Sequence, residues 1–156
     1  MFAIDCPQTI KQVYQDIKNG DDPWVAIGDF SHDWYGNYTE IAQRLALVSE
    51  VVELSVEGAS REQRQWAAFC AASVEYLCQE AGLAVPSWVD NPAYILPKED
   101  AFYTSPLAFK QRVRERLEQE SPAAFRKRNV FCSKRVYANK YEAVVTLNTD
   151  MVLQAI

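Results

Sequence analysis

Glycine and histidine are scarce in this sequence, and their scarcity disfavours several kinds of active site. The 156 residues include five scattered glycines, which form neither a G-x-G-x-x-G nor a G-x-x-x-x-G-K-[ST] motif. The one histidine, His32, belongs to no H-E-x-x-H motif, and no G-x-S-x-G motif is present. Nucleotide-binding enzymes of the common classes are therefore disfavoured. We predict no catalytic residues and no cofactor.

Long apolar runs are also missing. The longest weakly polar stretch, residues 67–77, contains Glu75 and is far shorter than a membrane span. The first residues lack the basic segment and apolar run that are typical of a secretory signal. Hydrophobic residues make up 49% of the chain and charged residues 24%, which is ordinary globular composition. We expect a cytoplasmic protein without membrane association, forming a single domain over residues 1–156.

Metal-binding patterns are weak as well. The four cysteines include no C-x-x-C pair, and with one histidine they cannot form a zinc site at the usual spacings. Free and mostly buried thiols are expected. Asp29, His32 and Asp33 have the i, i+3, i+4 spacing of one helix face, which resembles the metal spacing of carboxylate bundles. Such a site needs several further inward carboxylates, so we interpret these residues as an exposed polar face and predict no metal.

Helical periodicity dominates the chain. The strongest helix is predicted to begin at Ser60, in capping-box spacing with Gln63, and to end at Gly82. Further helix starts are Asp22 followed by Pro23, Thr39 followed by Glu40, Ser105 followed by Pro106, and Ser121 followed by Pro122. In the helix after Ser105, the apolar stripe is Phe109, Val113 and Leu117. These signals predict an all-α fold, an irregular bundle of six or seven helices around residues 60–82.

Two regions leave alternatives open. Residues 130–131 and 141–147 are rich in β-branched and aromatic side chains and could pair as a small C-terminal β-hairpin, whereas Asn148 or Thr149 could cap a terminal helix. The proline-rich segment 85–106 should wrap across the helices, pinned by its aromatic residues. Of these, Trp88, Tyr94 and Tyr103 either belong to the core, which we favour, or line a ligand pocket.

Charge is distributed unevenly along the chain. Residues 1–104 contain 6 basic and 16 acidic side chains, a net charge of −10, whereas residues 105–156 contain 10 basic and 5 acidic ones, a net charge of +5. Such a split can be balanced by internal ion pairs or can attract a charged partner. The candidate binding residues form one basic cluster: Arg126, Lys127, Arg128, Lys134 and Arg135.

Three interpretations of this basic cluster remain open. It can be a solvated helix end, because cations stabilise a helix C-terminus, or a site for an acidic protein, or a site for nucleic acid. Nucleic acid is disfavoured because the sequence pI is about 4.9 and no recognisable reading motif is present. Arginine binds carboxylates in a bidentate way, so Arg126, Arg128 and Arg135 are the strongest candidates for an acidic partner.

Four segments carry a resemblance to known proteins: PWVAIGDF (23–30), WAAFCAASVEYLC (66–78), PSWVDNPAYILP (86–97) and SPAAFRKRNVF (121–131). They resemble a family of small uncharacterised bacterial proteins. The last three segments also resemble the C-terminal part of helix-turn-helix proteins thought to act as antitoxin-like partners of nucleotidyltransferase-type toxins. The first 60 residues show no helix-turn-helix, so the resemblance implies a helical partner-binding module without direct operator binding.

We therefore expect a non-enzymatic protein-interaction module, antitoxin-like in the sense of that resemblance, that binds a protein partner through its basic C-terminal face. The alternative is a small enzyme or ligand-binding protein that uses an aromatic pocket around Trp88, Tyr94 and Tyr103. A deep pocket with a perturbed titratable group would favour the enzyme. An exposed apolar patch beside the basic cluster would favour the binding module.

Overall fold

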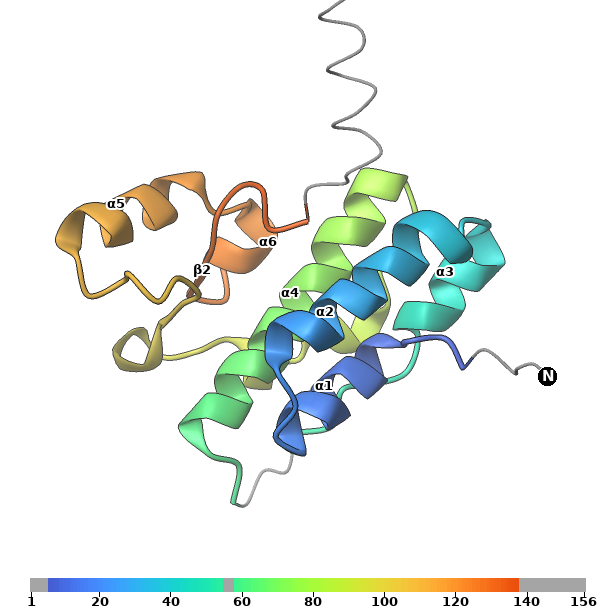
Figure 1. Cartoon of the computed structure of the whole chain (residues 1–156), viewed down its shortest axis with the longest axis horizontal. Coiled ribbons are helices and arrows are strands. Elements are labelled where there is room, and N and C mark those ends of the chain that lie inside the picture. The colour runs from blue at the N-terminus through green and yellow to red at the C-terminus, as the bar shows by residue number, and fades with distance from the viewer. Residues whose placement is uncertain (1–5, 55–57, 138–156) are drawn as a thin grey trace, which may run out of the picture.

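Helix α4 (Arg61–Ala81) is the element around which the others pack (Figure 1). The computed structural model describes residues 6–54 and 58–137. Ser60 caps α4: its hydroxyl accepts a hydrogen bond from the backbone N–H of Gln63, whose side chain accepts one from the N–H of Ser60. Gly82 ends the helix at a φ of +70°, where glycine is strongly preferred. The predicted bounds of this helix are confirmed.

Helix α4 is buried on nearly all sides. Every residue from Trp66 to Cys78 except Tyr76 is buried, including the four alanines at 67, 68, 71 and 72. Such a helix must be covered by neighbours, and alanines allow their backbones to come close. In Figure 1, α1, α2 and α3 lie on one side of α4, and α6 and β2 lie on the other.

The first side is built from three helices. They are α1 (Ile10–Lys18), α2 (Pro23–His32) and α3 (Ile41–Val48), with a π-helical turn over Asp33–Asn37 between the last two. The carboxylate of Asp22 accepts the N–H of Trp24 at 2.9 Å and caps α2, with Pro23 at its first position. The helix start predicted at Asp22 is confirmed.

The second side begins with a segment of short 3-10 turns. These cover Ser87–Asp90, Pro92–Tyr94 and Lys98–Asp100 and lead into strand β1 (Phe102–Tyr103). Helices α5 (Gln111–Glu120) and α6 (Ala123–Arg126) and strand β2 (Val130–Phe131) follow. The prediction that the proline-rich segment is too irregular for a long helix is confirmed.

The small sheet differs from the hairpin considered above. Residues 130–131 do form a strand, but its partner within the described residues is β1, and the two strands run parallel. Residues 141–147, the other half of that hairpin, lie outside the described residues. The all-α prediction is confirmed, since the described parts of the chain contain six α-helices and only this one pair of two-residue strands. None of the helices described is long and apolar enough to cross a membrane.

Candidate functional site

The basic cluster predicted from the sequence divides into exposed and buried members. Arg126, Lys127, Lys134 and Arg135 are exposed. Arg128 is 2% exposed, so its expected place on a binding surface is corrected. Its guanidinium donates hydrogen bonds to the carbonyls of Ala124 at 2.7 Å and Val89 at 2.9 Å. Arg128 thus fastens α6 to the proline-rich segment and cannot meet a partner.

Glu75 is the reason that Arg128 is buried. This carboxylate projects from the middle of α4, is 6% exposed, and accepts a hydrogen bond from Arg128 at 3.0 Å. The ammonium of Lys127 lies 2.6 Å from the same oxygen, Oε1. A buried carboxylate without a cation is strongly destabilising, so the fold supplies two. We call Glu75, Lys127 and Arg128 the buried ion-pair cluster.

Electrostatics keep Glu75 ionised within this cluster. Burial by itself raises the pKa of a carboxyl group, because it disfavours the charged form. The hydrogen bonds and charges of Lys127 and Arg128 outweigh burial and hold the pKa of Glu75 below its usual value. The cluster is therefore a charged contact that holds α6 against α4. Near neutral pH, Glu75 neither donates nor accepts a proton.

The exposed cations are not balanced by nearby acids. In residues 105–137 there are nine basic side chains and three acidic ones, a net charge of +6. Within the described residues, the ion pairs made by this segment are those of Lys127 and Arg128, and both end on Glu75. Seven cations therefore have no described acidic partner within 4 Å: Lys110, Arg112, Arg114, Arg116, Arg126, Lys134 and Arg135. We call these seven residues the basic surface.

The basic surface lies on one side of the molecule. Figure 1 shows α5, α6 and β2 together on the side of α4 opposite α1 to α3. Arg126 contributes to the fold as well, because its guanidinium donates to the carbonyls of Gln119 at 3.1 Å and Ser121 at 2.8 Å at the end of α5. The internal pairing considered for the charge split thus takes place at Glu75, and most of the positive charge stays at the surface.

The three aromatic residues predicted as a pocket do not come together. Trp88 and Tyr94 pack edge to face, with ring centroids 5.5 Å apart, and each hydrogen-bonds to a backbone carbonyl near α3. The indole of Trp88 donates to Val48 at 2.9 Å, and the hydroxyl of Tyr94 donates to Val52. Tyr103 instead stacks on Phe131, with centroids 4.9 Å apart. The alternative of a pocket shared by these three residues is therefore wrong. Tyr94 belongs to the core and Trp88 packs against it, as favoured above, and both anchor the proline-rich segment.

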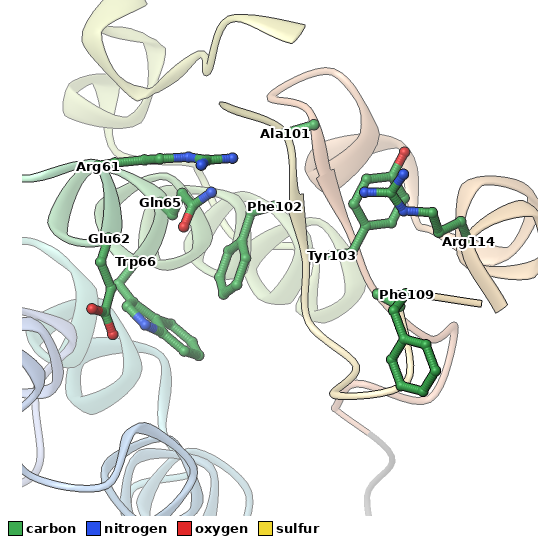
Figure 2. A pocket seen from close by; sticks show the side chains of 10 residues that line it. Arg61, Glu62, Gln65, Trp66, Ala101, Phe102, Tyr103, Phe109 and Arg114 are labelled. Atoms are coloured by element: carbon green, nitrogen blue, oxygen red, sulfur yellow. The ribbon is translucent and has the colours of Figure 1, made fainter. Parts of the chain in front are cut away.

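Tyr103 lines a different cavity, an open groove of about 620 Å³ between the start of α4 and the segment from β1 to α5 (Figure 2). Trp66 and Phe102 form one wall, with ring centroids 4.8 Å apart. Tyr103, Phe109 and Arg114 form the other wall. Sequence reasoning missed this groove, because its aromatic residues come from separate elements whose contact in space no local pattern reveals.

Nucleophilic and metal-ligating side chains are not assembled for chemistry in the described residues. Cys70, Cys78 and Cys132 are buried, and burial raises the pKa of Cys78 to about 11 and of Cys132 to about 12, which makes the thiols inert. No group of three or more His, Cys, Asp or Glu in the described ranges is placed to hold a metal ion. Asp33 accepts hydrogen bonds from Gln8 and Asn37, both at 2.8 Å, and so stabilises the local backbone.

Comparisons with known proteins add no assignment: no family model, curated protein or solved structure matches the chain. The resemblance to antitoxin-like proteins therefore stays a prediction.

Proposed function

We propose that this protein is a non-enzymatic binding module whose basic surface docks an acidic partner protein. The observation that carries the proposal is the lack of described acidic partners for seven cations within residues 105–137. Uncompensated positive charge attracts an acidic surface and speeds its association. Five of the seven are arginines, whose planar guanidinium groups suit bidentate binding of carboxylates.

The antitoxin-like role is the narrower form of this proposal. It takes its support from the resemblance of residues 66–131 to antitoxin-like proteins; the first 60 residues show no helix-turn-helix, so operator binding is not part of the proposal. In this form, the acidic partner is a second protein whose activity is neutralised by the contact. Co-expression with the partner, once identified, tests this form: the wild-type protein should relieve the growth defect that the partner causes.

Reversal of exposed cations tests the general proposal. The variant Arg126→Glu, Lys134→Glu, Arg135→Glu spares Arg128, because an acid at that position would face Glu75 in the interior. The matched control Lys11→Glu, Lys18→Glu, Lys98→Glu changes the net charge by the same amount on the first side of α4 and in the proline-rich segment. Each protein is used to capture partners from lysate of the native host, with and without nuclease treatment, at increasing salt.

We expect the wild type and the control to retain the same protein, and the first variant to lose it. Retention should weaken as salt rises, because the screening length falls from about 10 Å at 0.1 M to about 3 Å at 1 M. If the variant retains the protein at low salt, the basic surface is only solvated and the proposal is wrong. If nuclease treatment alone removes everything captured, the ligand is nucleic acid and the acidic-protein proposal is also wrong.

A further inference from the structure

Strand β1 has an unpaired outer edge. The N–H of Phe102 donates to Asn129 at 2.9 Å and the N–H of Thr104 donates to Phe131 at 3.0 Å, both toward β2. In an extended strand, the backbone groups of the intervening residue point the other way. The N–H of Tyr103 accordingly has no acceptor among the described residues, and the sheet they form contains β1 and β2 alone. This edge can hydrogen-bond to a further strand.

The groove described above lies along this edge. Figure 2 shows the β1 ribbon running between the two walls, with Phe102 directed toward Trp66 and Tyr103 directed toward Arg114. Phe109 is 77% exposed and projects from the second wall. An extended segment laid along β1 would therefore direct alternate side chains to the two walls.

The two walls differ in charge. On the second wall, Arg114 lies 4.7 Å from the centroid of Tyr103, and neither it nor Lys110 beside Phe109 forms an ion pair with a described acid. Glu118 nearby accepts the hydroxyl of Tyr103 at 3.3 Å. On the first wall, the charges are balanced more closely.

On that first wall, Arg61 is paired with Asp100 at 3.1 Å, and Glu62 lies close by. The first wall therefore suits apolar side chains on Trp66 and Phe102, and the second wall suits acidic ones.

From this geometry we infer that an extended segment of the acidic partner adds to the outer edge of β1 as a third strand, with apolar side chains toward Trp66 and acidic side chains toward Arg114. Backbone hydrogen bonds at Tyr103 would supply affinity, and the two walls would select an alternating apolar and acidic sequence. The inference rests on the proposed function, since it names the part of the acidic partner that enters the groove.

The test uses the full chain and four synthetic peptides. The probe is acetyl-EVEIEVE-amide. The first control is the same peptide methylated on alternate backbone nitrogens, in separate versions for the two possible registers. The second control replaces every glutamate by lysine. Binding is followed by nuclear magnetic resonance, and hydrogen exchange is measured at the amides of Phe102, Tyr103 and Thr104.

We expect the probe to slow exchange at Tyr103 by about tenfold or more, equivalent to about 1.4 kcal/mol. Exchange at Phe102 and Thr104, whose N–H groups are already bonded to β2, should change much less. One methylated version and the lysine peptide should bind at least about tenfold more weakly. The variant Arg114→Glu should bind the lysine peptide more tightly than the probe. The variant Phe109→Ala should bind the probe more weakly than the wild type without losing stability, because Phe109 is exposed.

Three results would overturn the inference. The first is that the probe does not bind, or binds as tightly when methylated in either register. The second is that the Tyr103 amide already exchanges slowly in the free protein, so that the edge is covered; if that protection grows with protein concentration, the occupant is a second copy of the chain. The third is a preference for acid that Arg114→Glu leaves unchanged. The capture experiment separates this inference from the proposed function. If one of these three results is found and the triple variant at 126, 134 and 135 still loses the captured protein, the strand site is wrong but the proposed function stands.

Discussion

The two sides of helix α4 are held by different chemistry. On the side of α1 and α2, Trp24 lies edge-on to Trp66 and Phe69, with ring centroids 5.7 and 5.9 Å apart. No side chain of these two helices makes a buried hydrogen bond to α4 in the described structure. On the side of α6, Phe125 packs on Phe69 at 5.4 Å, and Arg128 adds a buried ion pair to Glu75.

In addition to this ion pair, several hydrogen bonds connect elements on the second side. The hydroxyl of Ser121 accepts the N–H of Cys132 at 2.9 Å, and the amide of Asn129 donates to Leu96 at 2.6 Å. The hydroxyl of Tyr137 donates to Ser73 on α4 at 2.8 Å. Hydrogen bonds require fixed partners, whereas apolar contacts depend mainly on shape. The second side should therefore respond to pH and to single polar substitutions, and the first side should not.

Arg128→Ala should give the largest effect. It leaves the buried Glu75 with Lys127 alone and removes the donor of two backbone carbonyls, those of Ala124 and Val89. We therefore expect a loss of about 3–5 kcal/mol in the free energy of unfolding. Arg135→Ala is the matched control, because Arg135 is exposed, and it should change stability by less than about 0.5 kcal/mol. Urea titration followed by circular dichroism measures both. Equal effects for the two variants would show that Arg128 does not hold the second side.

Leu77→Ala should have the next largest effect, a loss of about 2–5 kcal/mol in the free energy of unfolding, because Leu77 is 1% exposed within the main core. Leu117→Ala on α5 should cost less. Leu117 is buried but lies outside the main core cluster, where the surroundings can close over a cavity more easily. The same urea titrations compare the two. A loss below about 1 kcal/mol for Leu77→Ala would contradict its place in the packed interior.

Acid should weaken the second side through Glu75. Because its pKa is lowered by folding, the ionised Glu75 contributes stability above the pKa of the unfolded state, and this contribution is lost as pH falls through the folded-state pKa. Glu75→Gln should lose about 1.5–3 kcal/mol at pH 7, the range for hydrogen bonds to charged groups. The difference between wild type and variant should shrink as pH falls toward 3. A difference that stays constant with pH would show that Glu75 is not ionised in the fold.

Local signals explain why α4 was predictable. Its first residues carry a capping box, its end carries a glycine at positive φ, and its interior is apolar over many turns. Each of these features is visible within a few residues of sequence. The same holds for α2, whose N-cap is Asp22 as expected.

Long-range pairing explains what the sequence could not show. Arg126, Lys127 and Arg128 look alike in sequence, and the choice of Arg128 for burial depends on Glu75, which lies 53 residues earlier. An acid inside the apolar stretch 67–77 was the available signal. Phe109 was placed on an apolar helix stripe, but α5 begins at Gln111, so Phe109 precedes the helix and is exposed. The groove was missed for the same reason, since its walls meet only in three dimensions.

The smallest predicted effect has the opposite sign. Arg112 and Arg116 are exposed one turn apart on α5, and like charges at this spacing destabilise a helix by about 0.2–0.5 kcal/mol. Arg116→Gln should therefore raise the free energy of unfolding by about this amount at low salt, and the gain should vanish at 1 M salt. Arg126→Gln is the matched control: it removes the same charge but also two hydrogen bonds to backbone carbonyls, so it should lower stability. Replicate urea titrations at low salt and at 1 M salt measure the change in the free energy of unfolding for each variant. If Arg116→Gln lowered stability at low salt, its charge would be compensated within the fold, and the basic surface would lose part of the uncompensated charge on which the proposed partner binding depends.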